Sequence, residues 1–194
     1  MKIGIDIDEV VADFYGTFLS YYNLRYNKKV CFEDLLEYKA NIFGEDREKI
    51  DNIFNEFFKS DDFDKIELKE GAFEGISFLD DNFDIVFVTA RCCSLKHKTF
   101  NFFNKFFPGR NFDIVFIGDD SFNMDKFNIC KSLECDLIIE DKGETCLDFA
   151  KKGAISILLD KPWNQGIEHS NIYRCFSWSE IVEKVNESGI KDGN

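Results

Sequence analysis

The chain of 194 residues lacks the features that mark several classes of protein. No apolar stretch approaches the roughly 20 residues that a membrane-spanning helix needs. Only two histidines are present, His97 and His169, and they stand far apart, which argues against a histidine zinc site. Also missing are a phosphate-binding P-loop, a dinucleotide-binding glycine fingerprint, an internal repeat and a linker rich in Pro, Gly or Ser. These absences favour one main domain without a nucleoside-triphosphate or dinucleotide fingerprint.

Positive charge is also scarce. The chain has 24 Lys and Arg against 37 Asp and Glu, which gives a formal net charge of −13. Such a balance disfavours binding to polymeric nucleic acid or to an acidic membrane surface. A small phosphate ester can still bind where a metal ion and a lysine reverse the local potential. We therefore expect a small-molecule partner.

The cysteines point to the compartment. Seven are present, an odd and scattered set without metal-like spacing, which favours reduced thiols over a disulfide framework. The chain opens directly on an expected strand. We expect a cytoplasmic protein.

The most informative feature is the end of that first strand. Residues 1–10 begin with β-branched side chains and then reach Asp6 and Asp8, an Asp-x-Asp pair. In a parallel sheet this pair would lie at the carboxyl edge, where open α/β folds bind their ligands. Two carboxylates there can divide nucleophilic or metal-binding work from proton transfer. Taken alone, the pair is also typical of a strand end that is simply solvated.

Three further apolar runs end in useful polar groups. Residues 83–88 lead to Thr89, residues 113–117 precede Lys126, and residues 136–139 lead to a Glu-Asp pair. Short β-rich runs separated by helix-length segments indicate βαβ units and a parallel sheet. All strand ends then meet at one edge, so we expect these groups to converge on the Asp-x-Asp pair.

Each assignment has an alternative. Thr89 is a good strand residue and could simply end its strand. Glu140 and Asp141 could stabilise the start of the helix expected after them. Lys131 rivals Lys126, but it lies about 7.5 Å further along the same expected helix and is turned by roughly 140°. We therefore choose Lys126.

At this point the chain resembles a known family. The ordered motifs are similar to those of the haloacid-dehalogenase-like phosphohydrolases, and residues 6–14 look like the opening of the 5′(3′)-deoxyribonucleotidases and their bacterial relatives. A segment near the end is similar too, with Lys161-Pro162-Trp163-Asn164 followed by Arg174 and Trp178. The resemblance covers nearly the whole chain.

The resemblance implies a phosphatase mechanism. Asp6 would attack phosphorus and form an aspartyl-phosphate, while Asp8 would protonate the leaving group and later activate water. Thr89, the Ala90 backbone amide and Lys126 would bind the phosphate oxygens. The favoured substrate is a deoxy- or ribonucleoside 5′- or 3′-monophosphate.

The same resemblance implies a Mg²⁺ site. Asp6, the backbone carbonyl of Asp8, and Asp141 would be its ligands. Glu140 would support the site without touching the metal. Two departures stand out: Glu9 occupies a position where glycine is frequent, and the last motif reads Glu-Asp where Asp-Asp is common.

The expected fold is α/β, a Rossmann-like parallel sheet with helices on both faces and a small helical cap inserted after the first strand. The core would comprise residues 1–15 and 71–185, the cap residues 16–70, and a polar tail residues 186–194. The resemblance implies that Phe14 helps line a nucleoside pocket beneath the cap, where stacking of a base is worth about 1–3 kcal/mol.

Other functions remain open. The nearest alternative is a phosphatase for a sugar phosphate or another small metabolite. A phospho-signalling domain also places acids, Thr and Lys on a parallel sheet, although in a different order, and a non-catalytic interaction protein is the third alternative. Residues 99–107 carry five phenylalanines, which suit core packing and leave a homodimer contact open.

Overall fold

One parallel sheet lies at the centre of the computed structural model, which describes residues 1–35, 46–118 and 125–189. The order of its strands is β3-β2-β1-β4-β5-β6, and every neighbouring pair is parallel. The strands within these described ranges are β1 (Lys2–Ile5), β2 (Asp84–Thr89), β3 (Asp113–Phe116), β4 (Leu137–Glu140), β5 (Ile155–Leu159) and β6 (Ile172–Cys175). The order reverses on the two sides of β1, which makes the carboxyl end of β1 the switch point of the sheet.

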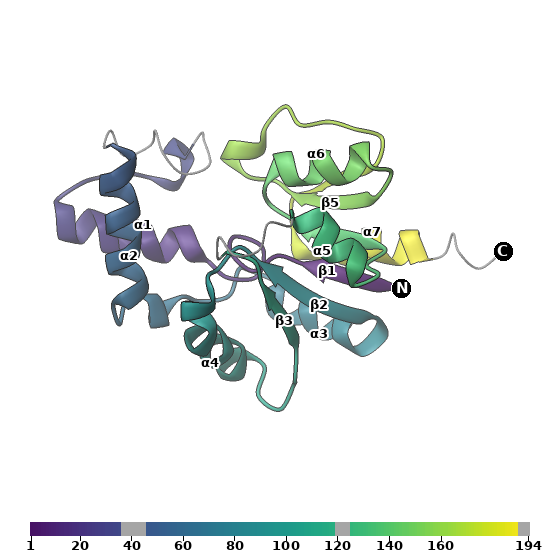
Figure 1. Ribbon diagram of the computed structural model, residues 1–194, viewed down its shortest axis with the longest axis horizontal. Coiled ribbons are helices and arrows are strands. Elements are labelled where there is room, and N and C mark those ends of the chain that lie inside the picture. The colour runs from purple at the N-terminus through teal and green to yellow at the C-terminus, as the bar shows by residue number, and fades with distance from the viewer. Residues whose placement is uncertain (36–45, 119–124, 190–194) are drawn as a thin grey trace.

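Helices cover both faces of this sheet (Figure 1). α3, α4 and α7 pack on one face, where residues such as Ile5 and Phe87 are buried, and α5 and α6 pack on the other against Val86 and Ile138. The described helices are α1 (Phe14–Tyr26), α2 (Arg47–Lys59), α3 (Ala72–Asn82), α4 (Lys96–Phe106), α5 (Lys126–Ser132), α6 (Gly143–Lys151) and α7 (Trp178–Gly189). Short 3₁₀ helices are η1 (Phe32–Asp34), η2 (Phe63–Lys65), η3 (Cys93–Leu95) and η4 (Pro162–Asn164). The expected α/β fold is confirmed.

The inner strands are apolar on both faces because helices cover both. β2 shows the pattern: Ile85 and Phe87 point to one layer of helices, while Val86 and Val88 point to the other. Continuous runs of β-branched residues are typical of such doubly covered parallel strands. The apolar runs that predicted β1, β2 and β4 arise from this burial.

α1 and α2 stand apart from the sheet-covering helices, beside the carboxyl edge of the sheet (Figure 1). They are held together by aromatic rings, with Phe18 stacked on Phe54 at 4.3 Å between ring centroids. The apolar side chains that α1 and α2 share between them are buried: Phe14, Phe18, Tyr21, Tyr22, Ile50, Ile53, Phe54 and Phe57. The domain boundaries stay a prediction, and residues 36–45 of the expected cap lie outside the described residues.

Some elements differ from expectation. α7 runs to Gly189, so the helix continues past Asn186 into the segment expected to be a polar tail. Residues 190–194 of that tail lie outside the described residues. β6 and α3 were not predicted. None of the five phenylalanines in residues 99–107 is exposed, which fits core packing. Within the described ranges, every helix is too short or too polar to cross a bilayer.

Candidate active site

The carboxyl ends of β1, β2 and β4 bring polar side chains from distant parts of the chain to one place. Asp6 and Asp8 follow β1, Thr89 ends β2, and Glu140 ends β4. Because β1 lies between β2 and β4, these groups surround the switch point of the sheet. Open α/β sheets bind their ligands at this position.

Lys126 joins the ends of β1 and β4. It is the first residue of α5, and Asp125 fixes that start by accepting a hydrogen bond from a backbone N–H of the first turn at 2.8 Å. The Lys126 Nζ donates to Oδ1 of Asp6 and to Oε2 of Glu140, both at 2.6 Å. Lys131 is exposed near the other end of α5, so Lys126 is the lysine that reaches the acids.

Burial and charge set the protonation of these acids. Burial, helped by the charge of Glu140 and opposed by Lys126, raises the pKa of Asp6 to about 7. Burial also disfavours the ionised form of Glu140, but Lys126, a side-chain hydrogen bond with Asp141 and the backbone N–H of Lys142 overcome it and hold the pKa of Glu140 below its usual value. Lys126 therefore stabilises Glu140 as the ionised partner, and Asp6 gains its charge less readily.

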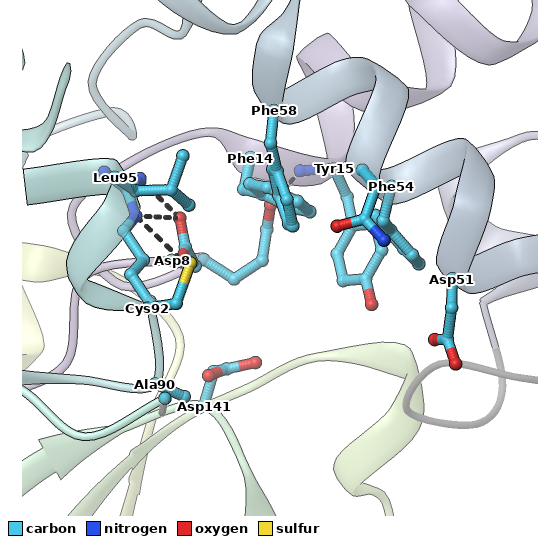
Figure 2. Close-up of a pocket in the computed structure, with 14 residues that line it drawn as sticks. Asp8, Phe14, Tyr15, Asp51, Phe54, Phe58, Ala90, Cys92, Leu95 and Asp141 are labelled. Carbon is cyan, nitrogen blue, oxygen red and sulfur yellow. Dashed lines mark hydrogen bonds and ion pairs between the residues drawn. The ribbon is translucent and has the colours of Figure 1, made fainter. Parts of the chain in front are cut away.

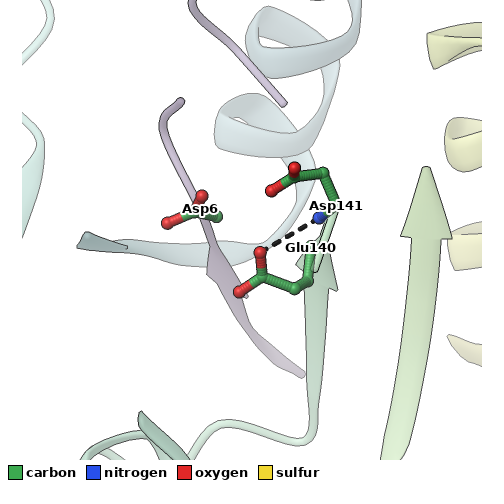
Figure 3. Close-up of side chains that lie close together, drawn as sticks. All are labelled: Asp6, Glu140 and Asp141. Carbon is green, nitrogen blue, oxygen red and sulfur yellow. Dashed lines mark hydrogen bonds between the residues drawn. The ribbon is translucent and has the colours of Figure 1, made fainter. Parts of the chain in front are cut away.

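Three carboxylates of this cluster are close enough to share a cation. Asp6, Glu140 and Asp141 each offer an oxygen, and these oxygens lie within 4.8 Å of one another (Figure 3). Burial, followed by the charges of Glu140 and Asp6, raises the pKa of Asp141 well above its usual value. A hard divalent cation such as Mg²⁺ prefers oxygen ligands and would relieve this repulsion. These oxygen donors fit the expected metal, although the cluster includes Glu140, which the resemblance places outside the ligand set.

Asp141 is held from the opposite side by η4 and its flanks. The Trp163 Nε1 donates to Oδ2 of Asp141 at 2.9 Å, and the Asn164 Nδ2 donates to the backbone oxygens of Asp141 and Leu159 at 2.7 and 2.8 Å. These bonds fix the backbone and one carboxylate oxygen of Asp141. They hold Asp141 beside the carboxylates of Asp6 and Glu140.

Asp8 is bound by Arg91, which lies two residues beyond the end of β2. The Arg91 Nη2 donates to Oδ1 of Asp8 at 2.6 Å and the Nε donates to Oδ2 at 3.0 Å. The third nitrogen, Nη1, donates to Oγ1 of Thr99 at 3.0 Å, and the guanidinium lies 5.1 Å from the ring centroid of Phe63. This two-pronged contact fixes the orientation of the Asp8 carboxylate.

Glu9 follows Asp8 in a left-handed backbone conformation, with φ of 62°. Glycine adopts this conformation without strain, which accounts for the glycine that the resemblance implies at this position. In this chain the buried Glu9 side chain accepts a hydrogen bond from the backbone N of Tyr15 at 2.6 Å and one from Lys69 at 3.1 Å. Lys69 also donates to Asp13 at 2.8 Å. The network joins the two chain segments that lead into and out of α1 and α2.

Thr89 and Ala90 form the end of β2. The Thr89 side chain is fully buried, and its hydroxyl accepts a hydrogen bond from the backbone N of Arg91 at 3.1 Å. Ala90 lines the cavity described below, together with Gly118. A Cβ on Gly118 would come within 2.0 Å of the Ala90 carbonyl oxygen, so only glycine permits this approach. The phosphate-binding roles of Thr89 and Ala90 stay predictions.

A cavity of about 560 Å³ opens between this edge of the sheet and the two helices beside it (Figure 2). This volume lies within the roughly 300–1,000 Å³ typical of small-molecule sites. Asp8, Ala90 and Asp141 lie on the sheet side of the cavity, and aromatic rings lie on the helix side. Those rings are Phe14, Tyr15, Phe54 and Phe58. The sheet side of the cavity is polar and acidic, and the helix side carries these rings together with Asp51 and Asn55.

The structure brings the predicted acids and Lys126 together, and Phe14 is among the residues that line the cavity although it is largely buried. Sequence reasoning gave no role to Arg91, Tyr15 or the Trp163 indole. Arg91 carried the best signal, since it follows a strand end that was expected at the convergent edge. Its partner could be found only once β1 and β2 were seen side by side.

Comparison with known proteins agrees with this geometry. Residues 1–188 match the model of the family described as 5′ nucleotidase, deoxy (pyrimidine), cytosolic type C. The chain belongs to this family. A nucleotidase of Clostridium acetobutylicum is 27% identical to this nucleotidase-family protein over 193 residues, covering 96% of this chain and 94% of the relative.

Solved structures show the same fold. A haloacid-dehalogenase-like hydrolase of Streptococcus pneumoniae aligns with a TM-score of 0.68 at 12% identity, covering 95% of this chain and 97% of that one. A hydrolase of the same superfamily from Deinococcus radiodurans, solved with bound phosphate and sodium, also has a TM-score of 0.68, at 11% identity over 97% and 96% of the two chains. These structures show the fold, and the family match confirms the predicted nucleotidase-like subgroup; the nucleotidase is a phosphoric monoester hydrolase.

Proposed function

We propose that this nucleotidase hydrolyses deoxy- or ribonucleoside 5′- or 3′-monophosphates in a Mg²⁺-dependent reaction. One observation carries the proposal. Asp6 and Glu140, which Lys126 bridges, offer oxygens within 4.8 Å of an oxygen of Asp141, and Asp141 lines the polar side of a cavity whose other side carries aromatic rings. A nucleotide has the same polarity, with a dianionic phosphate at one end and a flat base at the other.

Asp6 supplies the nucleophile. Lys126 is bonded to Oδ1 of Asp6, so Oδ2 is the oxygen that we expect to attack phosphorus. The bond from phosphorus to the ester oxygen breaks, and Asp8 gives its proton to the departing alkoxide. Water then attacks the aspartyl-phosphate, Asp8 takes a proton from that water, and phosphate leaves with Asp6 restored.

The phosphate oxygens need positive partners, since most of the surrounding side chains are acidic. Lys126 supplies one charge, and the Ala90 backbone N–H and Thr89 hydroxyl supply uncharged donors in this proposal. Bound Mg²⁺, with Asp6, Asp141 and the backbone carbonyl of Asp8 as ligands, would add the charge neutralisation that phosphoryl transfer requires. Glu140 keeps Lys126 in place from outside that ligand set.

The aromatic end of the cavity favours a nucleoside over a bare sugar phosphate. Phe14, Phe54 and Phe58 line it, with the Phe14 and Phe54 rings stacked at 6.1 Å between centroids. Every base has a π-face, so stacking of this kind tolerates different bases. The proposal therefore names nucleoside monophosphates as a class.

The partner and compartment follow the chemistry of the chain. A net charge of −13 favours a small phosphate ester over a nucleic-acid polymer or an anionic membrane. All seven cysteines have free thiols, which suits a reducing compartment, and we propose the cytoplasm.

Phosphate release from a panel of monoesters tests this function. Purified protein is incubated with ribo- and deoxynucleoside 5′- and 3′-monophosphates, several sugar phosphates and p-nitrophenyl phosphate. We expect nucleotides to be the best substrates, EDTA to stop release, Mg²⁺ to restore it, and Zn²⁺ to substitute poorly in an all-oxygen site. Preference for sugar phosphates would overturn the substrate class, and full activity in EDTA would overturn the metal requirement.

A further inference from the structure

Tyr15 places a hydroxyl group in the cavity that the proposed steps do not use. The residue lies in the first turn of α1 and is 4% exposed, and its ring points toward the space between Asp141 and Asp51 (Figure 2). No residue in the described ranges hydrogen-bonds to this hydroxyl. A buried phenol that faces a ligand cavity without a partner is suited to bind the ligand.

The hydroxyl is a donor under all ordinary conditions. Burial, followed by the charges of Asp141, Glu9 and Asp8, raises the pKa of Tyr15 well above its usual value. The phenol therefore keeps its proton at neutral pH. It can donate to an uncharged oxygen, and it adds no positive charge with which to attract phosphate.

The position of Tyr15 is fixed at both ends. Its backbone N donates to Glu9, the residue that stands in the left-handed conformation. Its ring lies 5.4 Å from that of Phe14 in an edge-on arrangement and 5.3 Å from that of Trp163, which in turn holds Asp141. A group held in this way is preorganised, so little entropy is lost when it binds a ligand.

The geometry points to a specificity role: we infer that the Tyr15 hydroxyl donates a hydrogen bond to a sugar hydroxyl of the substrate. This inference rests on the proposed function. Tyr15 lies between the acidic end of the cavity, which would hold the phosphate, and Phe54 and Phe58, which would hold the base. The sugar is the part of a nucleotide between these two ends, and its hydroxyls are uncharged acceptors.

Paired changes, one in the enzyme and one in the substrate, test this contact. Tyr15→Phe removes only the hydroxyl and keeps the ring that packs on Trp163. We compare kcat/KM of both enzymes for one nucleoside 5′-monophosphate, for its 2′-deoxy and 3′-deoxy analogues, and for p-nitrophenyl phosphate. Tyr21→Phe is the matched control, because Tyr21 lies on the same helix but does not line the cavity.

One neutral hydrogen bond corresponds to a loss of roughly 2- to 13-fold in kcat/KM. Tyr15→Phe should show this loss for substrates that carry the contacted hydroxyl, and no loss for the analogue that lacks it. The analogue that escapes the loss tells which hydroxyl is bound. The generic ester and the Tyr21→Phe enzyme should show no change.

Two results would overturn the inference while leaving the proposed function standing. In one, the wild type prefers nucleotides and Tyr15→Phe matches it on every substrate. In the other, Tyr15→Phe lowers kcat/KM for p-nitrophenyl phosphate as much as for the nucleotides, which would mean that the hydroxyl contacts the phosphate. If the wild type hydrolyses the generic ester but no nucleotide, the proposed function itself fails, and the inference fails with it.

Discussion

Arg91 offers the sharpest test of how this site works. Its guanidinium is 3% exposed and binds both oxygens of Asp8, which is 25% exposed. If Asp8 transfers protons, Arg91 is a positioning residue that aims it. Arg91→Lys keeps the positive charge but cannot reproduce the two-pronged contact, because the lysine ammonium acts as a point charge.

The size of the effect follows from the contacts that are lost. A hydrogen bond to a charged group is worth about 1.5–3 kcal/mol, which corresponds to roughly a 10- to 150-fold change in rate. Since Asp8 is partly exposed, solvent screening places the expected fall in kcat near the lower end. General acid–base catalysis contributes about 10²–10⁴-fold in total. The fall in kcat caused by Asp8→Asn is therefore the largest fall that Arg91→Lys can cause through Asp8.

The choice of leaving group distinguishes an effect of Arg91 on the orientation of Asp8 from an effect of Arg91 on phosphate binding. A nucleoside leaves as an alkoxide that needs a proton, whereas p-nitrophenolate leaves without one. In rapid-quench experiments, Arg91→Lys should slow the first turnover of a nucleotide. The same enzyme should still release a rapid burst of p-nitrophenolate, followed by slow turnover while the aspartyl-phosphate waits for its water to be activated.

A double mutant provides the control. In an Asp8→Asn background, Arg91→Lys should cause little further loss, because the group that it aims is already absent. An equal slowing of the nucleotide and of the p-nitrophenolate burst would refute the reasoning, and so would additive losses in the double mutant. Either result would mean that Arg91 acts on the phosphate directly.

Two further predictions concern the metal and the base. Asp141→Asn should abolish Mg²⁺-dependent activity yet stabilise the metal-free protein. Because burial and neighbouring charges raise the pKa of Asp141 well above its ordinary value of 3.8, the folded wild type loses stability as pH rises above that value, so the gain in Tm of the variant measured in EDTA should grow with pH from about pH 4 upwards. A Tm difference that does not change with pH would contradict this. Phe14→Ala should lower kcat/KM for a nucleoside monophosphate by roughly 5- to 150-fold and kcat/KM for p-nitrophenyl phosphate much less, with the fold of the variant checked by melting. Equal losses for the two substrates in a folded protein would favour a metabolite phosphatase.

Much of the core could be predicted from the sequence because its strands are buried on both faces. β6 was missed because Arg174, which binds Asp160 and Asn164, interrupts its four residues and leaves no continuous apolar run. α3 contains Gly75, which weakens a helical pattern. The structure explains that glycine, since a Cβ there would come within 2.3 Å of the Trp178 ring on α7. A contact so distant in sequence leaves no local signal.

The residues of the candidate site could also be predicted only in part. Asp6, Lys126 and Glu140 could be brought together in advance because each follows or begins an element whose place in a parallel sheet is known. Arg91 and Tyr15 could not, because their roles depend on side-chain direction. For Tyr15 that direction depends on Glu9, whose left-handed backbone and buried carboxylate fix the start of α1.

The most direct test of the account is the rate of phosphate release by Asp6→Asn with the best nucleoside monophosphate. The amide is nearly isosteric with the carboxylate but cannot form the acyl-phosphate, so turnover should be lost while melting shows an intact fold. Retention of more than about a tenth of the wild-type kcat, equivalent to less than about 1.4 kcal/mol of barrier, would contradict Asp6 as the nucleophile.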